Sequence, residues 1–406
     1  DELGRTAAAL RERLRIADRP ASPRWAGGAD VLFDARCLQT PAFGTRGIGR
    51  FARAALDGVR ASVGDDRLVL LVDPGLEPLP ADLAGAARQV RRVDEREVPR
   101  YGALVQPSPM TATALPLLPL LHSEAKKVAV VFDFIPMHYP TVYLRHFAAR
   151  AEYAAALDAL RLYGEFVCIS ALARTELLTL LGRPGEGPEA VSAVVAWPRD
   201  VLPAGEEMPA AHGTGPIVVM TGDEPRKNTF GALAGIGAAT AGEPGRDVVV
   251  IGMAGQGDRV HHWSIAAAMR PGEARTLDRI SDDEMQALLA SASLVVVASF
   301  DEGLSLPVIE ALRAGVPVVA ADIPAHRELI GTGSFLADPA SPTSIASAVR
   351  RHAGRASTQQ RQAQRLLQHK HQVLEDVVGA MVGSAAKAAS VDLPSAAINV
   401  SGRTLR

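Results

Sequence analysis

The sequence predicts an α/β protein of two similar domains, each a doubly wound parallel sheet covered by helices. Short β-branched runs alternate with longer segments rich in alanine and leucine. Strands that are apolar on both faces, each followed by a helical pattern, are typical of parallel sheets with helices on both sides. The chain of 406 residues is long enough for more than one domain, and a segment rich in glycine and proline divides it.

The predicted elements of the N-terminal half alternate between strand and helix. A helical pattern over residues 1–17, carried by Leu3, Leu10 and Leu14, precedes the first strand and is an addition to the sheet. Apolar runs then predict strands at Val31–Phe33, Leu68–Val72, Val128–Phe132, Phe166–Ile169 and Val191–Ala196.

The boundary between the domains lies between Leu202 and Gly215, where no helical or strand period is visible. We therefore predict domains over residues 1–208 and 209–370, followed by a segment over residues 371–406. A helical pattern runs from Thr358 to about Ala388, and the last residues show no period. Strands of the second domain are expected at Ile217–Met220, Val248–Ile251, Leu294–Ala298 and Val316–Ala320.

Charge and cysteine content exclude several classes of protein. Lys and Arg number 43 and Asp and Glu 45, and this net charge of −2 argues against a nucleic-acid binder held by bulk charge. Cys37 and Cys168 are too few for a disulfide scaffold, and their strand-like surroundings predict buried thiols in a reducing cytoplasm. No apolar run approaches the ~18 residues of a membrane span, and the chain starts at Asp1 without a secretory pattern.

The segment from Leu294 to Leu312 contains the strongest candidate functional groups, and its pattern predicts a strand, a loop and a helix. Pro307 fits the first helical position, where its missing N–H costs nothing. The loop before it presents backbone N–H groups at the positive end of a helix, which favours a bound phosphate. Glu302 and Glu310 flank the helix start and can point into the crevice above the strand ends. Alternatively, Glu310 only satisfies the helix N-terminus and Glu302 is a solvated carboxylate.

A second strand, loop and helix begins at Ile217 and repeats this arrangement. Its loop contains Arg226 and Lys227, which could neutralise a diphosphate. Asn228 fits the N-cap of the following helix better than a ligand contact. The alternative for Arg226 and Lys227 is a solvated basic pair at a loop tip.

Together these two loops resemble the sugar-nucleotide site of retaining glycosyltransferases of family 4, which have the GT-B fold. The resemblance covers most of the chain and is strongest from Thr221 to Asp338. Four segments match the family's glutamate-bracketed loop and helix, the next strand, the phosphate-binding loop and the segment flanking the nucleobase: residues 302–312, 315–320, 223–228 and 280–284. The resemblance implies an N-terminal acceptor domain and a C-terminal donor domain facing a central cleft, with a C-terminal helix that crosses back to the first domain.

The resemblance also implies residue roles on the donor side. Lys227, with Arg226 beside it, would hold the diphosphate. Glu310 would accept hydrogen bonds from the ribose, and Glu302 would lie near the transferred sugar. The remaining donor contacts would be the backbone at Ile280, for the base, and the N–H groups of Gly303, Leu304, Ser305 and Leu306, for sugar or phosphate oxygens.

The N-terminal domain carries two weaker matches. In its glycine-rich loop, Gly47 and Ile48 would face the donor phosphates, and Arg46 and Arg50 would add positive potential; a flexible turn is the alternative. At the acceptor side, Asp133 would orient the acceptor or act as its base.

This sequence departs from the family pattern at several positions. Phe132 replaces a histidine that precedes Asp133 in the family, and His138 either faces the cleft instead or has a structural role. Gly222 stands where many members carry an arginine. Leu304 and Ser305 replace a frequent phenylalanine and glycine, which changes the acceptor wall.

We therefore expect a cytoplasmic glycosyltransferase that moves a hexose-type sugar from a nucleotide sugar, as co-substrate, to an acceptor hydroxyl. The chain contains no D-x-D motif, so transfer without a metal is expected, and no cofactor. The resemblance to retaining enzymes implies that the anomeric configuration is retained. The acceptor stays open between a carbohydrate, a lipid-linked saccharide and an aglycone. Peripheral contact with the inner membrane face also stays open, although the arginines near Arg92 fit a solvated face better.

Two other functions are consistent with the sequence. A catalytically silent sugar-nucleotide-binding or scaffolding module is the alternative that Phe132 and Gly222 motivate. A sugar-nucleotide epimerase on the same fold has less support, because no acid–base set for it is visible. The donor sugar, its base and the oligomeric state are not determined by the sequence.

Overall fold

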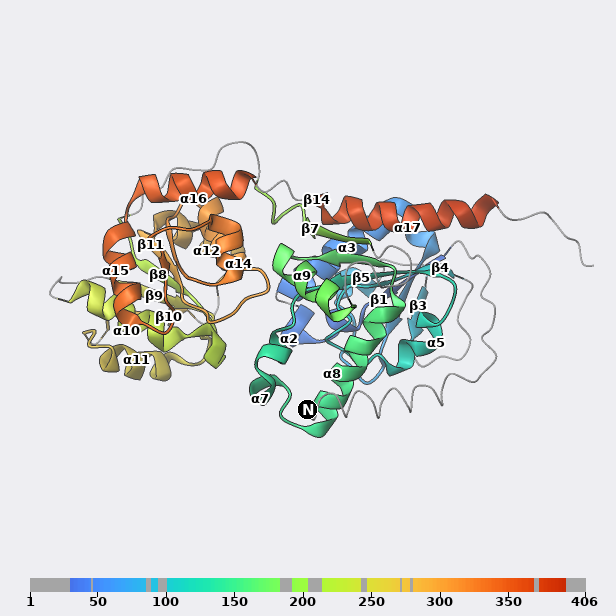
Figure 1. Ribbon diagram of the computed structural model, residues 1–406, viewed down its shortest axis with the longest axis horizontal. Coiled ribbons are helices and arrows are strands. Elements are labelled where there is room, and N and C mark those ends of the chain that lie inside the picture. Colours follow the sequence, from blue (N-terminus) through green and yellow to red (C-terminus); the bar gives the residue numbers. More distant parts are fainter. Residues whose placement is uncertain are drawn as a thin grey trace, which may run out of the picture.

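The computed structural model describes residues 30–44, 47–84, 89–93, 101–182, 192–203, 214–241, 247–270, 272–277, 280–368 and 372–391. The helix expected over residues 1–17, the tail from residue 392 onward and Arg46 lie outside these residues. The described chain forms two α/β domains side by side (Figure 1), each with a parallel sheet between layers of helices.

The N-terminal domain is built on a parallel sheet with the strand order β14-β7-β6-β5-β4-β1-β2-β3. Because every strand in it is parallel, all their carboxyl ends reach the same edge, which is the edge that faces the second domain. Its strands are β1 (Asp30–Asp34), β2 (Leu68–Val72), β3 (Gln89–Arg92), β4 (Tyr101–Gln106), β5 (Lys126–Val131), β6 (Glu165–Cys168), β7 (Ser192–Trp197) and β14 (Gln372–Val373). Its α-helices are α2 (Pro41–Gly44), α3 (Gly47–Val63), α4 (Ala81–Ala84), α5 (Leu118–Leu121), α6 (Ile135–His138), α7 (Pro140–Tyr143), α8 (Phe147–Ala159) and α9 (Ala171–Leu180).

The C-terminal domain has a second parallel sheet, with the order β10-β9-β8-β11-β12-β13. Its strands are β8 (Ile217–Met220), β9 (Val248–Ile251), β10 (Ala274–Leu277), β11 (Leu294–Val297), β12 (Val318–Ala321) and β13 (Leu336–Ala337). Its α-helices are α10 (Thr229–Thr240), α11 (Gly257–Ala266), α12 (Asp282–Ser291), α13 (Leu306–Arg313), α14 (Pro324–Ile330), α15 (Pro342–His352) and α16 (Ala356–Gln368). Residues of β8 and β11 are fully buried, which agrees with their uniformly apolar sequences.

The predicted fold class is confirmed, but the sequence patterns missed several strands. The most consequential is β4, which lies between β1 and β5 near the middle of its sheet. Its buried run is interrupted by Gly102 and ends on the polar Gln106, so the apolar signal covers only Ala103–Val105. Strands β3, β10, β13 and β14 lie at or near sheet edges, where short and partly polar sequences are usual.

The C-terminal helix α17 (Leu374–Val391) lies on the N-terminal domain along α3 (Figure 1). The preceding helix, α16, stays on the C-terminal sheet, so the return to the first domain happens after it. Glycines allow the close approach of α17 and α3: a Cβ on Gly58 would lie 2.3 Å from the carbonyl oxygen of Glu375. A Cβ on Gly379 would likewise lie 2.9 Å from the carbonyl oxygen of Gly58.

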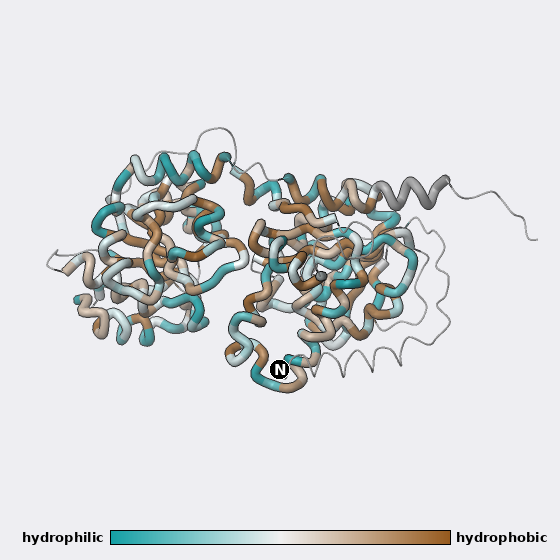
Figure 2. Tube along the Cα trace, viewed as in Figure 1, coloured by the Kyte–Doolittle hydropathy of each residue, from teal (hydrophilic) through white to brown (hydrophobic). Residues whose placement is uncertain are grey.

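Apolar segments fill both sheets, whereas the outer faces of helices such as α16 are polar (Figure 2). Both cysteine thiols are buried and free. Cys168 lies in β6 as expected, but Cys37 lies in a short 3-10 turn, Arg36–Leu38, and not in a strand. Among the described residues, no helix is long and apolar enough to cross a membrane.

Candidate active site between the domains

A cleft of about 470 Å³ lies between the two domains, at the carboxyl ends of both sheets. The N-terminal domain contributes Gly47, Ile48, Phe132 and Asp133 to its lining. The C-terminal domain contributes six of the expected site residues, Arg226, Lys227, Glu302, Gly303, Leu304 and Leu306, whereas Ser305, Glu310 and Ile280 do not line this cleft. Residues far apart in the sequence therefore meet in one groove.

The centre of this cleft is a buried carboxylate held by two cations. The side chain of Glu302 is 7% exposed, and its oxygens lie 2.7 Å from Lys227 Nζ and 3.1 Å from an Arg226 nitrogen. Burial alone would raise the pKa of Glu302, but the charges of Lys227 and Arg226 outweigh burial and lower it. Arg226 also lies 3.4 Å from Glu224, so the two cations are matched by two carboxylates at this point of the cleft.

The loops that carry these three side chains follow neighbouring strands. The loop with Arg226 and Lys227 follows β8, and the loop with Glu302 follows β11, which pairs with β8. The two loops are tied together by a backbone hydrogen bond of 2.8 Å from the N–H of Phe300 to the carbonyl of Arg226. Parallel pairing of β8 and β11 is therefore what brings the cations to the carboxylate.

Asn228 stabilises this arrangement in a way that differs from our expectation. It stands at the N-cap position of α10 with a left-handed backbone (φ 53°), but its side chain makes no capping hydrogen bond. Its amide instead donates to the carbonyls of Ala298, at 3.0 Å, and Pro339, at 2.8 Å. Asn228 thus joins three loops of the C-terminal domain around the site; it occupies the predicted N-cap position, but without a side-chain capping bond.

Helix α13 begins beside the Glu302 carboxylate, at Leu306, so Pro307 is its second residue and not its first. The side chain of Ser305 is turned inward, with its Oγ 3.1 Å from Nε2 of the buried His326. Within the described part of the chain, the N–H groups of Gly303 and Leu304 have no protein partner, whereas the N–H of Leu306 donates to the Leu304 carbonyl at 3.2 Å. Of the four predicted N–H donors, Leu306 is thus engaged in this structure.

The start of α3 faces the start of α13 across the cleft. A Cβ on Gly47 would lie 3.0 Å from Cδ1 of Leu306, so the two residues are in contact. Gly47 and Leu306 are the first residues of α3 and α13. Two helix N-termini, each with a partial positive charge, therefore converge on the same space as Lys227.

Glu310 and Ile280 lie in an adjoining cavity of about 570 Å³, which continues from Gly47 and Leu306. Arg50 binds Glu310 at 3.2 Å and Asp200 at 2.6 Å. Burial raises the pKa of Glu310, although the Arg50 charge acts in the opposite direction. Glu302 and Glu310 therefore lie in different cavities, and the cation bound to Glu310, Arg50, comes from the other domain.

Asp133 and Gly303 are in direct contact across the domain boundary. A Cβ on Gly303 would lie 2.7 Å from the Asp133 Cβ and 2.9 Å from the Phe132 carbonyl oxygen. Asp133 Oδ1 also accepts the N–H of Ile135 at 3.1 Å. Burial raises the pKa of Asp133, and the neighbouring carboxylates of Glu302 and Asp301 add to this effect. The carboxyl of Asp133 is thus a better proton acceptor than an exposed aspartate.

Sequence patterns missed a second set of contacts that join the domains. His138 Nδ1 lies 2.7 Å from Asp301 and its Nε2 lies 3.1 Å from Glu176, so it bridges the two domains instead of entering the cleft. Tyr143 donates to Glu224 at 2.6 Å and lies 3.1 Å from Arg226. Tyr143 lies in α7 and Glu176 in α9, and no sequence pattern marks either for a contact with the other domain.

Two Rossmann-like parallel sheets with a shared cleft make this a GT-B protein. Crystal structures of Anabaena HepE with UDP and glucose and of sucrose-phosphate synthase from Thermosynechococcus elongatus have the same fold. Their TM-scores are 0.58 and 0.60, with 14% identity in each case, and each match covers 89% of this chain and 99% of the other.

The predicted resemblance to group 1 glycosyltransferases is confirmed by sequence comparison. Residues 216–355 match the family described as Glycosyl transferases group 1. Over 192 residues the chain is 28% identical to O-antigen chain mannosyltransferase B of Escherichia coli, covering 45% of this chain and 49% of the relative. The chain thus matches about half the length of this curated relative.

Proposed function

We propose that the chain transfers a hexose-type sugar from a nucleotide diphosphate sugar to an acceptor hydroxyl, with retention and without a metal. The observation that carries the proposal is the meeting of Lys227, Arg226 and two helix N-termini in one interdomain groove. A leaving pyrophosphate develops negative charge, and preorganised cations and N–H dipoles are what stabilise it. These groups supply positive charge where a bound divalent ion would otherwise be needed.

The positions of the other residues support a division of the groove into three parts. The nucleoside would lie by Glu310 and Ile280, and the diphosphate between the starts of α3 and α13. The sugar would lie by Glu302, whose carboxylate orients Lys227 and offers oxygens to sugar hydroxyls. The acceptor would approach from the side of Asp133.

In the proposed reaction, the bond between the anomeric carbon and the diphosphate oxygen breaks as the acceptor oxygen bonds to that carbon on the same face. The acceptor proton passes to Asp133, whose pKa is raised by burial. The pair of Glu302 and Glu310 is not a hydrolase pair, because Glu302 is held ionised by two cations and Glu310 lines a different cavity.

The test is release of nucleoside diphosphate from a panel of nucleotide sugars, GDP-mannose and UDP-glucose included, by the wild type and by Lys227→Met. Removing one preorganised donor at a developing oxyanion costs about 100- to 1,000-fold in rate, and we expect a loss of this size. Lys126→Met is the matched control. Lys126 lies at the amino end of β5, the end away from the cleft, and pairs with Glu165.

Two further measurements test retention of configuration and independence of a metal. Retention predicts that the first-formed product has the anomeric configuration of the donor, which NMR of the fresh reaction mixture measures. Metal independence predicts unchanged rates in excess EDTA. If nucleoside diphosphate binds but no donor is turned over with any acceptor, the catalytically silent module is the correct function; full activity of Lys227→Met would refute the assigned phosphate role.

A further inference from the structure

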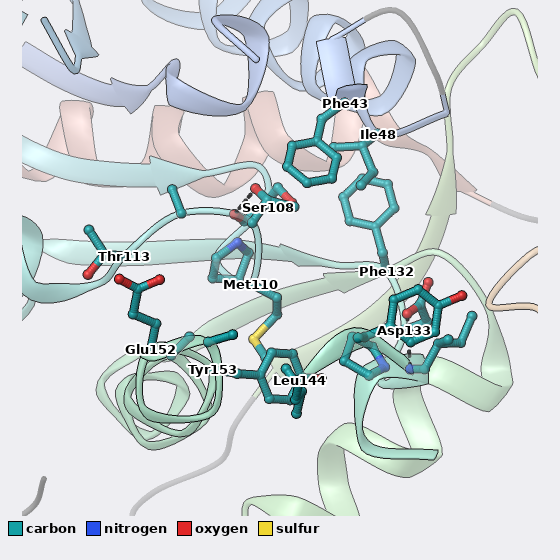
Figure 3. Close-up of a pocket in the computed structure, with 18 of the residues that line it drawn as sticks. Phe43, Ile48, Ser108, Met110, Thr113, Phe132, Asp133, Leu144, Glu152 and Tyr153 are labelled. Atoms are coloured by element: carbon teal, nitrogen blue, oxygen red, sulfur yellow. Dashed lines mark hydrogen bonds between the residues drawn. The ribbon is translucent and has the colours of Figure 1, made fainter. Parts of the chain in front are cut away.

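A second cavity of about 500 Å³ lies on the N-terminal side of the cleft (Figure 3). Phe132, Asp133 and Arg226 line both this cavity and the cleft, so the two spaces adjoin along these side chains. The walls of the second cavity are largely apolar and include Phe43, Ile48, Met110, Phe132 and Leu144. A volume of this size fits a molecule of one or a few rings.

One polar group in this wall has no protein partner. The Tyr153 residue is 6% exposed, and among the described residues its buried hydroxyl makes no hydrogen bond. Buried hydroxyls are nearly always paired, because leaving one unpaired costs free energy. Tyr153 lines the cavity (Figure 3), but its hydroxyl oxygen itself exposes less than 1 Å². An oxygen atom of a ligand in the cavity can serve as the missing partner once the Tyr153 side chain turns toward it.

The charges around the cavity are mostly negative. Asp133, Glu152 and Glu224 line it, and the only cation among its described lining residues is Arg226. Arg226 also borders the cleft assigned to the diphosphate, where it is bound to Glu302 at 3.1 Å. An anionic molecule, such as a phosphate-linked lipid, would therefore meet carboxylates without a free counter-charge.

We propose that this cavity binds the apolar ring system of a neutral, hydroxylated acceptor, that is, an aglycone. One oxygen of this acceptor would bind the Tyr153 hydroxyl, and the hydroxyl that attacks the sugar would lie at Asp133. The inference rests on the proposed function, because it concerns the acceptor of the same reaction. Of the three acceptor classes that the sequence leaves open, this proposal selects the aglycone, with a compact apolar ring system, over a free carbohydrate or a lipid-linked saccharide.

The test measures binding of naphthalene-2,6-diol, a neutral two-ring probe with a hydroxyl at each end, by fluorescence titration. Free mannose and geranyl phosphate are the polar and anionic comparisons. Ala149 lines the cavity on α8 and its neighbour Ala148 is exposed and does not. We expect Ala149→Phe to abolish diol binding and Ala148→Phe to leave the Kd unchanged.

Tyr153→Phe separates a binding role from a structural one. Loss of one hydrogen bond predicts a Kd for the diol raised by about threefold to tenfold. The melting temperature of the ligand-free variant should not fall, because the hydroxyl that is removed has no partner in the protein.

Each of three results would overturn the inference: mannose or geranyl phosphate binding more tightly than the diol, equal diol binding by Ala149→Phe and Ala148→Phe, or a drop in the melting temperature of Tyr153→Phe. Binding of nucleoside diphosphate is measured on the same samples. If nucleoside diphosphate binds and the diol does not, this inference fails alone; if no nucleotide sugar is turned over while the diol binds, the proposed function fails instead.

Discussion

Replacing Gly303 by alanine tests whether the contact between the two domains is required for transfer. The added Cβ would lie 2.7 Å from the Asp133 Cβ and 2.9 Å from the Phe132 carbonyl oxygen. Carbon atoms pack at about 3.5–4.0 Å, so the two loops must separate by about 1 Å. A misplacement of about 1 Å in an active site costs on the order of 100-fold in rate, and we expect kcat/KM to fall by this factor.

The assay compares Gly303→Ala with wild type in nucleoside diphosphate release and in thermal unfolding. The melting temperature should stay near that of wild type, because the clash lies between domains and not within a core. Gly164→Ala is the control, since a Cβ there would meet nothing within 4 Å and its backbone is not left-handed. A Gly303→Ala variant with wild-type kcat/KM would refute the reasoning that close contact of Asp133 and Gly303 positions the reactants.

One further prediction concerns an interdomain contact near the site, and two concern packing in the N-terminal domain. Burial opposes the charge of His138, but Asp301 and Glu176 outweigh it and raise its pKa; its interdomain bridge is therefore complete below the unfolded pKa of about 6.5 and lost as pH rises through the folded value. Donor KM should increase over that range, and His138→Gln should remove the dependence. Gly58→Val should destabilise the protein by about 1–3 kcal/mol through overpacking of α17 on α3, as measured by urea unfolding; unchanged stability would show that α17 is not docked there. Burial raises the pKa of Cys168 to about 12, so this thiol should react with a maleimide only on unfolding, as measured by mass spectrometry; fast labelling of the folded chain would contradict its burial.

The parts of the fold that sequence patterns predicted are those with uniform apolar runs. Strands β8, β9 and β11 are four-residue segments made mostly of Val and Ile with almost complete burial, so they stand out in the sequence. Strand β4 does not, because its ends at Tyr101, Gly102 and Gln106 break the pattern although the strand is central. Central position in a sheet is a tertiary property that a local window does not contain.

The same distinction applies to the site. The pair of Lys227 and Glu302 was within reach of sequence reasoning, because both follow parallel strands that meet at one sheet edge. The contacts of Arg50 with Glu310 and of Asp133 with Gly303 could not be predicted from the sequence, since they depend on how closely the two domains dock. The sequence does not mark Tyr153 as a site residue. It lies within an alanine-rich helix, and the pattern of that helix indicates only that the Tyr153 side chain is buried.

The central claim is that Lys227 and the start of α13 together hold a pyrophosphate between the domains. A crystal structure of the chain with bound GDP or UDP tests this claim most directly. We predict a phosphate oxygen within hydrogen-bond distance of Lys227 Nζ and of the N–H of Gly303 or Leu304. A nucleotide bound with its phosphates away from both groups would contradict the account.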